Sequence, residues 1–146
     1  MGIKEKRIGV FMKDKIIITY VYHSCYTVET KDLFIIFDYY KGKLNIPEDK
    51  EVIFISSHGH LDHYTSEILK LPDMENITYI LSSDIGKLDR NENIIFIKKN
   101  TTNLIHESVS IKHCSPSYSL RLKFSKFFPP QIRHHTDFLR GSCFCT

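Results

Sequence analysis

One short stretch of the chain, Ser57-His58-Gly59-His60-Leu61-Asp62-His63, contains several residue types that bind metal ions. Imidazole nitrogen and carboxylate oxygen are preferred ligands of zinc and related divalent ions. Side chains two apart lie on one side of an extended or turning backbone. Gly59 permits an unusual dihedral and a close approach to an ion. The pairs His58/His60 and Asp62/His63 therefore suit two adjacent metal ions.

The spacing excludes a helical zinc motif, which needs histidines four apart with a glutamate between them. The competing interpretation is an ordinary surface loop, which would suffice for a single histidine. An array of three imidazoles and one carboxylate repels itself once its histidines are protonated, and it adds nothing to a core. Its place directly after an apolar segment, 51–56, favours a metal site.

The elements that must position this loop are mostly strands. Segments rich in β-branched and aromatic residues predict them, and Thr65 or Ser66 can cap a short helix with Glu67 in its first turn. Strands that alternate with short connections favour a layered α/β architecture. The predicted strands are residues 15–22, 25–30, 33–37, 51–56, 77–81, 94–97 and 108–112.

The motif His58-x-His60-x-Asp62-His63 resembles the hallmark of the metallo-β-lactamase fold superfamily, which follows a sheet strand. Residues 22–30, which begin Tyr-His-Ser, resemble the early strand pair of that family. Residues 33–38 resemble its strand that ends in Asp. The similarity covers roughly 16–112 and is greatest to small hydrolases related to lactonases. It implies an αββα sandwich, of which this chain is expected to supply the N-terminal half.

By this resemblance His58 and His60 would bind the first metal ion, and Asp62 and His63 the second. Asp62 would also hold the nucleophilic water as the catalytic residue. Asp38 would support the ligand loop, or would simply be a turn residue at a strand end. The implied function is a metal-dependent hydrolase that uses one or two Zn²⁺, or another divalent transition metal, on an ester, lactone, amide or phosphodiester.

The later ligands of the family, a third histidine, a bridging aspartate often after glycine, and a final histidine, are harder to find. The sequence contains no Gly-Asp pair. His113 has the best position for the third ligand, whereas His106 is expected on a strand surface. The alternative function is therefore a truncated, inactive relative that binds at most one metal ion weakly.

The composition changes after Lys112, and Asp137 is the one acidic residue beyond it. We therefore expect residues 1–112 to form the N-terminal part of the domain and residues 113–146 an atypical segment. That segment is either irregularly packed or a replaced continuation, for example after a reading-frame change. Its His134, His135, Cys143 and Cys145 could form a Cys₂His₂ zinc site, but the irregular spacing favours a disordered tail.

The composition sets the remaining expectations. With 146 residues, 42% hydrophobic residues and a net charge of +3, the chain can bury a core and is not disordered as a whole. Its apolar runs are too short to span a membrane. Scattered Lys and Arg argue against a nucleic-acid partner and leave a small-molecule substrate; the oligomeric state is not indicated. No signal peptide is visible, so we expect a cytoplasmic protein.

In a reducing cytoplasm the four cysteines are expected to be thiols rather than disulfides. No base is placed to activate Cys25, so we expect a small buried apolar residue there rather than a nucleophile.

Overall fold

The computed structural model describes residues 6–11, 16–70, 77–86, 93–106, 109–114 and 119–124. The Cα positions divide the chain into two compact units, Met1–Phe96 and Ile97–Thr146, and each is described by itself. No helix in the described ranges is long and apolar enough to cross a membrane.

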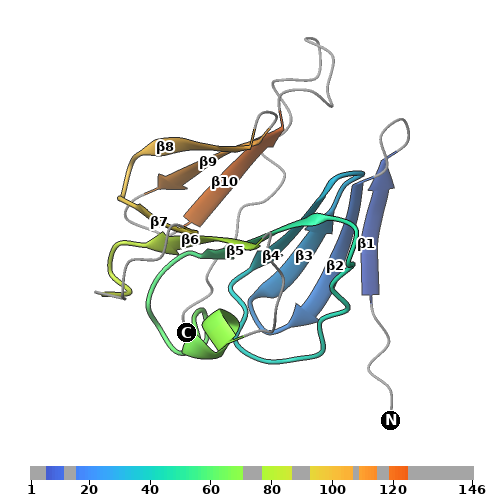
Figure 1. Ribbon diagram of the computed structural model, residues 1–146, viewed down its shortest axis with the longest axis horizontal. Coiled ribbons are helices and arrows are strands. Elements are labelled where there is room, and N and C mark those ends of the chain that lie inside the picture. Colours follow the sequence, from blue (N-terminus) through green and yellow to red (C-terminus); the bar gives the residue numbers. More distant parts are fainter. Residues whose placement is uncertain are drawn as a thin grey trace. The chain divides into compact units, whose positions relative to one another are not determined.

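The larger sheet contains seven strands, and their order in the sheet is their order in the chain (Figure 1). Antiparallel pairing joins the first four strands, and parallel pairing joins β4 to β5 and β5 to β6, so the sheet is mixed. The strands are β1 (Lys6–Phe11), β2 (Ile16–Tyr22), β3 (Cys25–Glu29), β4 (Leu33–Phe37), β5 (Glu51–Ser56), β6 (Ile77–Ser82) and β7 (Ile94–Ile97).

The parallel pairing decides where the predicted metal loop lies. The carboxyl ends of parallel strands meet at one edge of a sheet, so the residues that follow β4, β5 and β6 are neighbours there. The turn between β2 and β3 reaches the same edge, because β3 runs antiparallel to β4 and pairs Tyr26 with Phe37. The residues that follow β2, β4, β5 and β6 therefore lie at one edge of the sheet, although they are far apart in the sequence.

A short 3-10 helix, η1 (Ser66–Lys70), follows the loop. The backbone N–H of Glu67 donates to Oγ1 of Thr65 at 3.4 Å, so Thr65 is the cap of the two candidates. Within the described ranges η1 is the one helical element. The structure therefore shows a mixed sheet, and the helical layers of the expected sandwich are not among the residues it describes.

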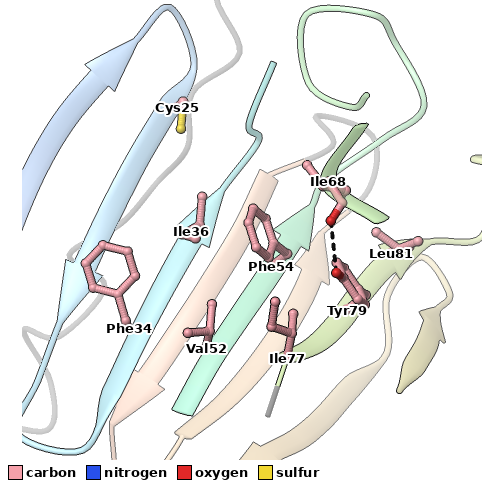
Figure 2. Close-up of a cluster of buried hydrophobic side chains, with 9 residues drawn as sticks. All are labelled: Cys25, Phe34, Ile36, Val52, Phe54, Ile68, Ile77, Tyr79 and Leu81. Carbon is pink, nitrogen blue, oxygen red and sulfur yellow. Dashed lines mark hydrogen bonds between the residues drawn. The ribbon is translucent and has the colours of Figure 1, made fainter. Parts of the chain in front are cut away.

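Buried side chains pack on one face of the large sheet beneath η1 (Figure 2). The rings of Phe54 and Tyr79 stack with centroids 5.7 Å apart, and Tyr79 Oη donates a 2.9 Å hydrogen bond to the carbonyl of Ile68 in η1. This contact ties the end of the loop to the sheet. The cluster consists of Cys25, Phe34, Ile36, Val52, Phe54, Ile68, Ile77, Tyr79 and Leu81.

The second unit contains a three-stranded antiparallel sheet in the order β10-β9-β8. Its strands are β8 (Thr102–His106), β9 (Val109–Cys114) and β10 (Ser119–Phe124). The strands β1, β8 and β10 are not among the predicted ones, and β10 lies within the segment 113–146, which was expected to be irregular. Alternation of Leu120, Leu122 and Phe124 with basic residues is a strand pattern that went unnoticed.

Candidate metal centre

Four strand connections bring polar side chains to one edge of the large sheet. The predicted metal loop leaves β5 at Ser57, Asp38 follows β4 directly, and Asp84 follows β6. His23 and Ser24 form the turn between β2 and β3. Hydrogen bonds connect three of the predicted ligands to these residues. Asp62 contacts His23, His58 contacts Ser57, and His63 contacts Asp38.

Asp38 is the centre of the buried part of the site. Its Oδ1 accepts the backbone N–H of Ser57 at 2.7 Å, and its Oδ2 accepts the Ser57 hydroxyl at 2.8 Å. The same Oδ2 lies 3.0 Å from Nδ1 of His63. Asp38 has a φ of 45°, which is uncommon for a residue other than glycine. It therefore supports the loop from behind, as expected of a residue that positions ligands.

The hydrogen bonds assign the ring protons of two predicted ligands. A carboxylate only accepts, so Nδ1 of His63 donates to Asp38. Ser57 uses its single hydroxyl proton on Asp38, so the 2.9 Å contact between Ser57 Oγ and Nδ1 of His58 has His58 as donor. In both rings Nε2 is then the nitrogen that a metal ion would take. The two ring centroids are 4.0 Å apart.

The pKa values of these two histidines shift in opposite directions, because their charged neighbours differ. Burial and the neighbouring His63 lower the pKa of His58, which keeps that ring neutral as a metal ligand requires. Burial opposes the charged form of His63 too, but the hydrogen bond and the charge of Asp38, with the charge of Asp62, outweigh it and raise the pKa of His63. The His63 ring therefore lies where a positive charge is stabilised.

Asp62 and His60 lie on the solvent side. Oδ2 of Asp62 is 3.4 Å from Nε2 of His63 and 3.2 Å from Nε2 of His23. Burial acts to raise the pKa of Asp62, but hydrogen bonding and the charges of His63 and His23 outweigh it and lower that pKa, so the group stays ionised. His60 is exposed, with its ring centroid 4.6 Å from that of His58. Its carbonyl accepts the backbone N–H groups of His63 and Tyr64, which closes the turn.

The site thus has two parts with different surroundings. We call the buried part, Asp38, Ser57, His58 and His63, the inner network. We call the solvent-facing part, His23, His60 and Asp62, the outer group. The four predicted ligands divide equally between them, two from each.

Gly59 has a different role from the one expected. Its φ lies outside the left-handed range, so no unusual dihedral is required. A Cβ at this position would lie 3.2 Å from Cα of Ile85 and 3.3 Å from the carbonyl oxygen of Asp84. Its N–H also donates to Oδ2 of Asp84 at 3.3 Å. Glycine is therefore favoured here, because the loop passes close to the turn after β6 and a Cβ would be tightly packed.

The other predicted site residues lie elsewhere. His113 is on β9 in the second unit, with Leu120 as its partner on β10, and His106 ends β8. The third ligand therefore stays a prediction. His134, His135, Cys143 and Cys145 lie outside the described residues.

Cys25 is fully buried, and burial, with the charge of Asp38, raises its pKa to about 12. It is a core residue, as predicted, and not a nucleophile.

His23 and Asp84 belong to the site but were given no role from the sequence. His23 stood within the stretch that resembled the family's early strand pair, so the resemblance was a usable signal. Asp84 is the first acidic residue after β6, and only the parallel pairing of β5 with β6 identifies it. Burial acts to raise the pKa of Asp84, but hydrogen bonding, including that from the Gly59 N–H, outweighs it and lowers that pKa.

The donor types, imidazole nitrogen and carboxylate oxygen, suit a divalent metal ion. The hydrogen bonds of the inner network suit one as well. A histidine ligand that donates its second ring nitrogen to a carboxylate or hydroxyl is the usual arrangement behind a bound metal. No group of three or more His, Cys, Asp or Glu side chains in the described part of the chain is already arranged to hold an ion. The fit therefore lies in the donor set and its supporting bonds.

Comparison with known proteins agrees with this geometry. A family model described as "Beta-lactamase superfamily domain" matches residues 17–115. No curated protein matches the chain. The crystal structure of a "Putative metal-dependent hydrolase" from Parabacteroides distasonis ATCC 8503 is similar with a TM-score of 0.59 and 15% identity, over 84% of this chain and 62% of that one.

This likeness shows the fold, and the chain spans about three-fifths of the length of that protein. The family match covers more than half of the residues and includes the whole metal loop and Asp38. The chain has a metallo-β-lactamase-like fold with a mixed β-sheet, and it belongs to the beta-lactamase superfamily.

Proposed function

We propose that this chain is a metal-dependent hydrolase that cleaves an ester, lactone, amide or phosphodiester bond in a small molecule. The observation that carries the proposal is the inner network. Asp38 and Ser57 fix the protons of two buried histidines on Nδ1 and so direct both Nε2 atoms to metal binding. Polar groups buried at a strand end, with no part in the apolar cluster, are more readily explained by function than by stability.

His58 and His60 would hold the first ion, and Asp62 and His63 the second. Zn²⁺ suits this mixture of imidazole and carboxylate, and another divalent transition metal is the alternative. When bound, the metal supplies a hydroxide at neutral pH and polarises the bond to be cleaved. His60 and Asp62 would complete the donor set from the solvent side.

The residues of the chain have separable tasks in such a reaction. Asp38 and Ser57 orient the two buried rings, and the backbone turn closed by the His60 carbonyl holds His60 and His63 on one short loop. Asp62, an ionised carboxylate with 44% of its side chain exposed, would accept a hydrogen bond from the attacking water. The αββα sandwich is part of this proposal.

Metal content tests the proposal directly. The purified full chain is saturated with zinc, gel-filtered and analysed for bound metal, and we expect about two ions per chain. His58→Ala should lose at least one ion, while His106→Ala, which removes an imidazole from β8, should lose none. Unchanged metal content in His58→Ala would overturn the proposal.

Turnover separates the active enzyme from the inactive alternative. A nitrophenyl ester, a γ-lactone, a nitrophenyl amide and bis(nitrophenyl) phosphate sample the four bond classes. Zinc-dependent hydrolysis of at least one, lost in His58→Ala and kept in His106→Ala, supports the proposal. One weakly bound ion without turnover on any of the four favours the inactive relative instead.

A further inference from the structure

The turn between β2 and β3 hydrogen-bonds to Asp62 of the predicted metal loop at two points. Nε2 of His23 lies 3.2 Å from Oδ2 of Asp62, and the hydroxyl of Ser24 donates to the backbone carbonyl of Asp62 at 2.7 Å. These contacts join residues 39 and 38 positions apart in the sequence. One contact fixes the backbone of Asp62, and the other fixes its carboxylate.

The backbone at His23 is unusual. Its φ is 51°, in the left-handed region that glycine adopts most readily. Two-residue turns between strands commonly have such angles and favour glycine or asparagine there. A histidine at this position keeps the turn but adds an imidazole, and that imidazole reaches Asp62. Uncommon backbone angles persist where the surrounding structure enforces them, and they gather at functional sites.

The bond is not explained by burial, because the side chains of His23 and Asp62 are 56% and 44% exposed. Exposed pairs of this kind contribute little to stability. The Asp62 oxygen that His23 contacts, Oδ2, also lies 3.4 Å from Nε2 of His63. The carboxylate is therefore held between a ring of the outer group and a ring of the inner network.

We infer that His23 is a positioning residue, which orients the Asp62 carboxylate toward His63 before a metal ion arrives, while Ser24 fixes the backbone beneath it. This inference rests on the proposed function, since Asp62 is a ligand only if the site binds metal. Residues that hold a ligand from outside the coordination shell typically change metal affinity by about 10–100-fold.

Zinc affinity of the full chain tests the role. In His23→Gly the strain of a left-handed residue is relieved and the imidazole is lost, so we expect the chain to unfold at an equal or higher denaturant concentration yet to bind its weaker zinc ion about 10-fold less tightly. His23→Gln places an amide nitrogen as many bonds from the backbone as Nε2, and it should restore most of the affinity. A loss of affinity without a loss of stability separates positioning from a structural role.

Asn100→Gly is the matched control, because Asn100 has a φ of 61° and lies in the second unit. It should relieve similar strain and leave zinc affinity unchanged. Equal zinc affinity in wild type and His23→Gly would overturn the inference. So would a loss in His23→Gln as large as that in His23→Gly.

Chelator-treated protein gives a readout that needs no metal. Unfolding midpoints of His23→Gly, Asp62→Ala and the double variant should be non-additive, because the two side chains touch. Additive shifts would remove the contact on which the inference depends. If wild type binds no zinc, the proposed function fails together with the positioning role, whereas zinc binding that ignores His23 removes the positioning role alone.

Discussion

The inner network and the outer group lie on the same loop but are held in different ways. The inner network is buried: Asp38 bonds to Ser57 and His63, and Ser57 bonds to His58. The outer group faces solvent and depends on one exposed bond and one backbone contact. The difference teaches that half of the candidate site is built into the buried fold, while the other half depends on exposed contacts.

The largest expected effect comes from the centre of the inner network. Asp38→Ala leaves the Ser57 N–H, the Ser57 hydroxyl and Nδ1 of His63 without their acceptor. Removing one partner from a buried polar set costs about 3–5 kcal/mol in unfolding free energy. Urea unfolding of chelator-treated protein measures it, with Asp62→Ala as the control at about 0–1 kcal/mol. Equal costs for the two variants would abolish the distinction between the two parts.

Ser57→Ala should have a smaller effect of the same kind. It removes the bridge between Asp38 and His58 and leaves a buried Nδ1–H of His58 without its acceptor, at a cost of about 1–3 kcal/mol. The His58 ring then loses its fixed proton position, so zinc affinity should fall by about 10-fold or more. Isothermal titration with zinc checks the second effect, and a normal affinity would show that His58 needs no support.

The buried thiol of Cys25 makes the stability of the folded chain depend on pH. Its pKa of about 12 in the folded chain lies above the ordinary value of 9.0, so the folded state keeps a proton that the unfolded state releases. The stability that the protonated Cys25 thiol contributes is fully present below pH 9 and is lost as the pH rises toward 12. At pH 10 the free energy of unfolding should be lower by about 1 kcal/mol. Cys25→Ala should flatten this part of the curve; identical slopes for both proteins between pH 8.5 and 10 would contradict the prediction.

The smallest expected effect on stability belongs to the outer group. His60→Ala removes an exposed ring and should change the unfolding free energy by no more than about 0.5 kcal/mol. The same variant should lose tight binding of one zinc ion, because the first predicted ligand pair is then incomplete. A stable protein with a defective metal site would sharpen the comparison, and a strongly destabilised one would place His60 in the inner network.

Much of the large sheet could be predicted, because β-branched and aromatic runs such as Leu33–Phe37 and Glu51–Ser56 fill both faces of a buried layer. The strands β1 and β8 were missed, since both carry few such residues in a row. Pairing partners are a tertiary property, so no local pattern could show that Asp84 lies beside Gly59. The expected helical layers remain a prediction.

In the candidate site, too, local patterns could be predicted and contacts between distant residues could not. Spacing alone singled out His58, His60, Asp62 and His63 as potential ligands, and their metal roles remain predictions. The family resemblance implied that Asp38 supports the loop, and its hydrogen bonds to Ser57 and His63 agree with that role. The role of His23 depends on a turn that is 39 residues away from its partner, and spacing along the chain carries no information about such a contact.

The order of the strands in the large sheet has a consequence for the folding pathway. Each strand pairs with the next one in the chain, so the hairpins β1–β2, β2–β3 and β3–β4 close short loops and can form early. The contacts of Asp38 with His63 and of His23 with Asp62 span 25 and 39 residues, and they form only after β5 has joined β4. Metal capture should therefore be a late kinetic event, and its rate would report the docking of β5 rather than the collapse of the chain.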